Sequence, residues 1–193
     1  PNSYKTKAEF LIEHSNSVET LILGSSHTFY GLQPKHFKSK VFNASNVSQS
    51  PDIDYAILKS YEDSLHNLKS VVIRLSYDTL FEQLKNSSED WRLKDYNIYT
   101  DVKFNYSNKH YSELLSTGTR QCLKVLKDYY FNNQSLLNCD SLGWGNNLEI
   151  KEKPDIEKVG LIAAKRHTIA SWDLLGYNIK MFESIIEWCK DRN

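Results

Sequence analysis

Two adjacent serines, Ser25 and Ser26, place hydroxyl nucleophiles at a position where ligand sites are common. They follow the apolar run 21–23 and Gly24. A run of β-formers predicts a buried parallel strand, and open α/β sheets hold their ligands at the carboxyl ends of such strands. Gly24 permits a sharp turn that would expose Ser26 at the head of the next element. The alternative interpretation is a strand followed by an ordinary serine-rich turn or helix N-cap.

Two further apolar segments also end in polar residues. Residues 41–43 run into a turn that contains Ser48, and residues 71–75 run into Ser76 and Asp78. Between them, apolar residues at 53, 57, 61 and 65 recur at helical spacing, which predicts a helix over 52–65. Because parallel strands need such crossovers, we expect 20–23, 41–43 and 70–75 to be neighbouring parallel strands.

The three strand-and-turn blocks between residues 21 and 78 resemble those of the SGNH (GDSL-type) hydrolase superfamily. Leu-Gly-Ser-Ser-His at 23–27 is similar to the first block, in the GSSH variant of some divergent branches. The asparagine-containing segment 41–50 is similar to the second block, and 71–78 to the third. The resemblance implies an α/β fold of three layers with a mainly parallel, flavodoxin-like sheet, and the activity of a serine esterase.

Carried over residue by residue, the resemblance makes Ser26 the nucleophile and its backbone N–H one donor to the oxyanion. Ser48 stands where the family has a glycine whose backbone N–H is the second donor. Asp78 stands where the family has an asparagine whose amide is the third donor. An ionised carboxylate accepts hydrogen bonds and repels an oxyanion, so Ser76 is the alternative donor. His27 and His167 are candidate substrate contacts.

This sequence has no catalytic base at the place in the chain where the SGNH family has one. The family takes its His and Asp from an Asp-x-x-His block after the last strand, and a serine hydroxyl is a poor nucleophile without them. The one such match, Asp63 to His66, falls at the end of the helix predicted over 52–65 on the flank of the sheet, and we interpret it as coincidence. We expect the chain to be part of a longer protein that continues into this block. The alternative is a complete small protein that has lost it.

Composition is typical of one globular domain over residues 1–193. The chain is 40% hydrophobic, and its 24 basic and 24 acidic residues give no electrostatic signature for nucleic acid or anionic membranes. Three cysteines at wide spacing argue against a disulfide framework or a zinc site. No nucleotide-binding glycine motif and no run of about 20 apolar residues is present. We therefore expect no cofactor, no metal and no membrane segment in this chain.

Residues 82–158 form a long segment that a minimal SGNH core would not need. Apolar residues between 115 and 129 predict a helix with a weak point at Gly118. The segment is rich in aromatic residues and asparagine, which suits a carbohydrate-binding lid. It also suits a packed subdomain or an interface, and we favour these two interpretations together over the lid. The last apolar-periodic stretch, 179–189, predicts a final helix with a charged end at 190–193.

The resemblance implies a serine esterase, acyl hydrolase or acyltransferase, acting on O-acetyl groups of bacterial envelope glycans. Its partner would be an acylated small molecule or carbohydrate. The competing hypothesis is a non-catalytic glycan-binding or envelope-assembly protein that keeps the fold without the chemistry. The resemblance favours the cell envelope as location, and the sequence leaves the cytoplasm open.

Overall fold

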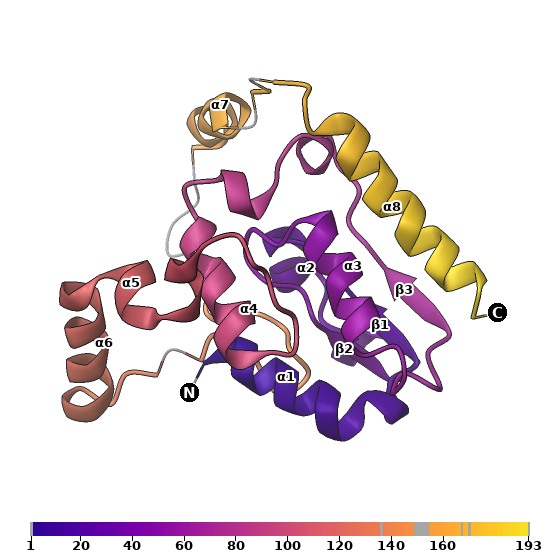
Figure 1. The fold of residues 1–193 in the computed structure, drawn as a ribbon, viewed down its shortest axis with the longest axis horizontal. Helices are drawn as coiled ribbons and strands as arrows, with labels where there is room; N and C mark the ends of the chain where they lie inside the picture. The colour runs from indigo at the N-terminus through magenta and orange to yellow at the C-terminus, as the bar shows by residue number, and fades with distance from the viewer. Residues whose placement is uncertain (1, 136, 149–154, 167, 170, 193) are drawn as a thin grey trace.

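A computed structural model describes residues 2–135, 137–148, 155–166, 168–169 and 171–192, and shows a mixed α/β fold with a small parallel sheet (Figure 1). The strands are β1 (Thr20–Ile22), β2 (Val41–Asn43) and β3 (Ser70–Val72). The helices are α1 (Ser3–His14), α2 (Ser26–Gly31), α3 (Pro51–Ser60), α4 (Leu93–Tyr99), α5 (Glu113–Thr117), α6 (Thr119–Phe131), α7 (Ile156–Arg166) and α8 (Leu175–Lys190). Short 3-10 turns connect several of them.

The central strand of the sheet is β1, with β2 on one side and β3 on the other, all parallel. Thr20 pairs with both Val41 and Ser70, so the three strands begin in register. β1 and β2 are buried along their whole length, whereas β3 is only partly buried. The prediction that these three segments are neighbouring parallel strands is confirmed, although the third strand ends at Val72 rather than at residue 75.

The predicted crossover helix is α3, which connects β2 to β3. Pro51 begins it, as expected of a residue whose fixed φ suits the first helical position. The helix ends at Ser60 rather than near residue 65, because the chain tightens into a turn in which Tyr61 O accepts the N–H groups of Ser64 and Leu65. This turn keeps both Tyr61 and Leu65 buried in the core.

The main core lies on one face of the sheet. Side chains of a strand alternate between faces, and Leu21, Leu23 and Phe42 share one face. Against it pack α1, α3, α4 and α8, which contribute core residues including Leu11, Ile53, Ile57, Tyr96, Ile185 and Trp188. The opposite face carries Asn43, whose side-chain amide donates to the carbonyls of Thr28 and Leu32 around the end of α2.

The segment 82–158 divides into parts with different packing. Its first part belongs to the core, since α4 and the stretch after it bury Leu93, Tyr96, Val102 and Phe104. A later turn approaches the edge of β2, where Asn43 N–H donates to Leu142 O. The backbone of Gly143 comes so near β2 that a Cβ built on Gly143 would lie 2.1 Å from the carbonyl oxygen of Asn43.

The helices α5 and α6 extend away from the sheet (Figure 1). The predicted weak point is a real break, because Gly118 with φ of +81° separates α5 from α6. Neither helix, each fully described, contains a buried residue. Leu123, Leu126 and Phe131 of α6 are 66%, 51% and 82% exposed.

The last helix, α8, packs against α3. It buries Phe182, Ile185 and Trp188. The periodicity that predicted this helix also included Ile179 and Ile186, which the structure leaves exposed because the buried face is centred one position away. In the part of the chain that the structure describes, no helix has the length and apolar character needed to span a bilayer.

Candidate functional site

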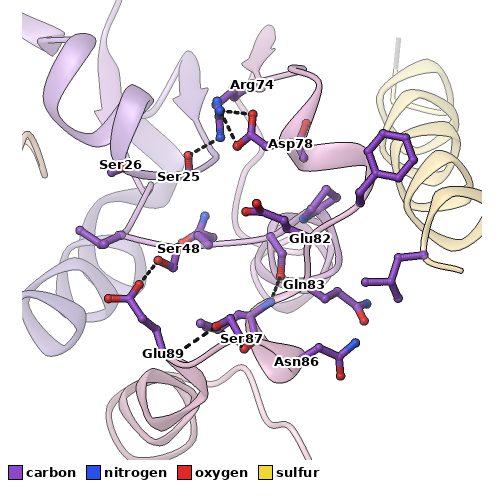
Figure 2. A pocket seen from close by; sticks show the side chains of 18 of the residues that line it. Ser25, Ser26, Ser48, Arg74, Asp78, Glu82, Gln83, Asn86, Ser87 and Glu89 are labelled. Carbon is purple, nitrogen blue, oxygen red and sulfur yellow. Dashed lines mark hydrogen bonds and ion pairs between the residues drawn. The ribbon is translucent and has the colours of Figure 1, made fainter. Parts of the chain in front are cut away.

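A polar cavity of about 650 Å³ opens at the carboxyl ends of all three strands (Figure 2). Ser25, Ser26 and His27 reach it from the turn after β1, and Ser48 from the turn after β2. Beyond β3, its wall includes Arg74, Asp78, Phe81, Glu82, Gln83, Asn86, Ser87 and Glu89. Its volume falls in the range of small-ligand sites. Four of the predicted site residues, Ser26, His27, Ser48 and Asp78, therefore line one cavity.

The turn that presents the two serines depends on Gly24. Its φ of +114° is a conformation that side-chain-bearing residues rarely adopt. A Cβ at this position would lie 2.9 Å from Thr28 Oγ1 and 3.1 Å from Arg74 Cβ. The chain then enters α2, with Ser26 as its first residue, half-buried at the cavity wall. The sharp turn expected of Gly24 is thus present.

Ser48 adopts a left-handed backbone conformation with φ of +59°. Such values are uncommon for residues other than glycine, which stands here in the family that the sequence resembles. The Ser48 hydroxyl donates a hydrogen bond to a carboxylate oxygen of Glu89, which reaches it from the opposite wall (Figure 2). Glu89 in turn accepts from Arg92 at 3.1 Å.

Beyond β3, a polar cluster surrounds Asp78. The Arg74 guanidinium donates from Nη2 to both carboxylate oxygens at 2.6 and 2.7 Å, and from Nη1 to Ser25 Oγ at 2.8 Å. Ser76 Oγ donates to the same carboxylate at 2.7 Å. Burial alone would raise the pKa of Asp78, but the hydrogen bonds from Ser76 and Arg74 outweigh it and hold the pKa below its ordinary value. Asp78 is therefore an anion here, and the Ser76 hydroxyl is engaged.

A second, buried network lies behind the serine turn. Asp54 of α3 accepts the Gly24 N–H at 2.9 Å and the Gln49 side-chain amide at 2.7 Å. Gln49 Oε1 accepts from the Tyr96 hydroxyl at 2.8 Å. Burial raises the pKa of Asp54 to about 7, and the two hydrogen bonds only partly oppose this. The network joins the turns after β1 and β2 to the helices α3 and α4.

Within the described part of the chain, one histidine, His27, lies in the cavity wall. His66 is an exposed residue of the turn after α3 and is not part of the cavity wall, in agreement with its interpretation as a coincidental match. His167 lies outside the described residues.

Sequence reasoning missed Arg74, Asp54 and Glu89. Arg74 carried a signal, because a charged residue interrupts the apolar run 71–75. Asp54 carried another, since an acidic residue stands beside Ile53 at the start of a strongly apolar helix. Glu89 carried none, because its approach to Ser48 depends on the path of the loop after β3.

No family model, curated protein or solved structure matches this chain. The resemblance to SGNH hydrolases therefore rests on the residues of the three sequence blocks alone.

Proposed function

We propose that the cavity is an acyl-transfer site of SGNH type, in which Ser26 attacks the carbonyl carbon of an ester. The three-layer arrangement of that superfamily is part of the same proposal. The observation that carries it is the meeting of Ser26, Ser48 and Asp78, from the ends of three parallel strands, at one cavity. A shared site at these strand ends is what the resemblance requires.

The conformation of Ser48 supports the proposal independently of its side chain. A left-handed residue turns its backbone N–H in a direction that an extended residue cannot. The family's glycine would adopt this conformation without strain, and Ser48 adopts it with φ of +59°. Backbone N–H groups of Ser26 and Ser48 would be the first two donors to the oxyanion.

The reaction begins when Ser26 Oγ forms a bond to the carbonyl carbon and a base takes its proton. The carbonyl π electrons move onto oxygen to give the oxyanion. When the C=O bond reforms, the ester C–O bond breaks, and the leaving alkoxide takes up the proton from the base. Water then hydrolyses the acyl-serine, or an acceptor hydroxyl receives the acyl group. The base belongs to the Asp-x-x-His block that the resemblance implies.

The lining favours an acylated carbohydrate as substrate. Asn86, Ser87 and Ser88, whose side chains carry amide and hydroxyl groups, line the cavity, and so does Phe81. Such groups donate to and accept from sugar hydroxyls, while an aromatic ring covers apolar C–H faces. O-acetylated envelope glycans belong to this class.

Acetyl transfer to Ser26 is the direct test. The chain is incubated with p-nitrophenyl acetate, with and without imidazole as a diffusible base, and the acetyl adduct is measured by intact-mass and peptide mass spectrometry. We expect an imidazole-dependent adduct on Ser26 that Ser26→Ala removes. Ser60→Ala, at an exposed serine ending α3, is the matched control. An adduct of equal yield in S26A refutes the proposal.

A non-catalytic glycan-binding role is the second candidate. It is favoured by the Asp78 carboxylate at the third donor position and by the absence of a histidine other than His27 from the described cavity wall. Saturable binding of an O-acetylated glycan by wild type and by S26A, together with no acetyl adduct under any condition, would establish this role instead.

A further inference from the structure

The third donor position of the site holds a group that cannot donate. Asp78 is ionised and accepts three hydrogen bonds, two from Arg74 and one from Ser76. The hydroxyl of Ser76 is directed to that carboxylate, which removes it as a substitute donor. An oxyanion formed at Ser26 would therefore find no hydrogen-bond donor on Asp78 or Ser76 and would need one from another group.

Arg74 is the group placed to intervene. Its side chain, 13% exposed, lines the cavity between the serine turn and Asp78 (Figure 2). Nη2 donates to both oxygens of the Asp78 carboxylate, and one N–H of Nη1 donates to Ser25 Oγ. A guanidinium carries five N–H donors, so Nη1 keeps a second N–H. The residue that receives the first one, Ser25, is the chain neighbour of the proposed nucleophile.

The backbone also brings Arg74 to the serine turn. Arg74 Cβ would stand 3.1 Å from a Cβ built on Gly24, and Arg74 N would stand 3.5 Å from it. Only the missing side chain of Gly24 lets the chain after β3 pass so near the turn. Asp78 accepts from Nη2 and Ser25 accepts from Nη1, so both terminal nitrogens of the guanidinium are held, which orients the group as well as positioning it.

We propose that Arg74 is a catalytic residue that donates to the developing oxyanion in place of the family's asparagine amide. This inference rests on the proposed function. In the acylation step, Ser26 Oγ bonds to the carbonyl carbon, its proton passes to the base, and the electron pair that moves onto the carbonyl oxygen is stabilised by Arg74 Nη1–H. Asp78 then serves as the anchor of the guanidinium rather than as a donor.

The experiment separates donation from mere charge pairing. Arg74→Met removes every donor but leaves Asp78 without its cation, which could disturb folding. The double variant R74M/D78L removes both charges and leaves neither unpaired. Acetylation of Ser26 by p-nitrophenyl acetate with imidazole is followed as a function of ester concentration, which separates the maximal rate from the half-saturation concentration. Circular dichroism and urea unfolding verify that each variant is folded.

We expect R74M and R74M/D78L each to lose roughly 10²- to 10³-fold in maximal rate, with little change in half-saturation, as for loss of one oxyanion donor. A folded R74M/D78L that acetylates Ser26 at the wild-type rate would overturn the inference, because Arg74 would then be only the counterion of Asp78. Failure of the proposed function gives a different result, since S26A would then equal wild type.

Discussion

Replacing Asp54 with asparagine should stabilise the protein at neutral and alkaline pH and leave its stability below about pH 4 almost unchanged. Asp54 is 2% exposed, and its carboxyl accepts the Gly24 N–H and the Gln49 amide. Both contacts are neutral, and the nearest charged group that affects it, Asp52, is itself an acid. The ionised form of Asp54 is therefore buried without a cation. Asparagine has nearly the same shape and can accept the same two hydrogen bonds.

The magnitude follows from the pKa. Burial raises the pKa of Asp54 from 3.8 to about 7 in the folded protein. Since each pKa unit corresponds to about 1.4 kcal/mol, ionising Asp54 in the folded state costs on the order of 4 kcal/mol more than in the unfolded chain. Between pH 4 and 7 the folded protein holds a proton that the unfolded chain has released. The free energy of unfolding therefore falls as pH rises through this range.

The assay compares urea unfolding of wild type and D54N at several pH values between about 5 and about 8. The difference in the free energy of unfolding should grow with pH in favour of D54N and level off above about pH 7. Other groups that titrate contribute to both proteins and cancel in the difference. A difference that stays constant across this range would show that Asp54 is not a buried, proton-bearing carboxyl, and the reasoning would fail.

Three further predictions concern stability. Burial lowers the pKa of Lys7 to about 7, so below that pH the folded protein holds a buried ammonium group that destabilises it. Lys7→Met removes this group and should raise the urea midpoint more at about pH 6 than at about pH 9. Ser48→Gly should leave the midpoint nearly unchanged, whereas Ser48→Val should lower stability by at least ~1 kcal/mol, because φ there is +59°. Gly143→Ala should destabilise strongly, since its Cβ would stand 2.1 Å from Asn43 O. Gly118→Ala meets no neighbouring atom, but at φ of +81° and ψ of 152° it should still cost about 1–3 kcal/mol of backbone strain; thermal unfolding distinguishes the two.

The sequence predicted the sheet well because its strands coincide with short apolar runs, of which β1 and β2 are fully buried. An apolar run such as 21–23 and a period of 3.6 such as that over 52–60 are local properties of the sequence. Boundaries were less accurate. The third strand ends early because Arg74 turns toward the cavity, and α3 ends early at the turn that begins with Tyr61.

The sequence predicted which residues line the cavity after each strand, but not the hydrogen bonds that these residues make. Positions after each strand indicated Ser26, Ser48 and Asp78, which do line one cavity. The contacts that define their chemistry join residues far apart in the chain, such as Arg74 with Ser25 and Ser48 with Glu89. No local pattern encodes the path of a loop, so these partners had to come from the structure.

The helices α5 and α6 should unfold locally at a lower free energy than the sheet and its core. Because α6 buries no residue, its 13 residues are held by their own backbone hydrogen bonds and by contacts with α5. Helices of this length are marginal in water without tertiary packing. They can open while the sheet stays intact, and their amide protons should exchange through local opening. The protons of β1, buried between two partner strands, should exchange only when the whole domain unfolds.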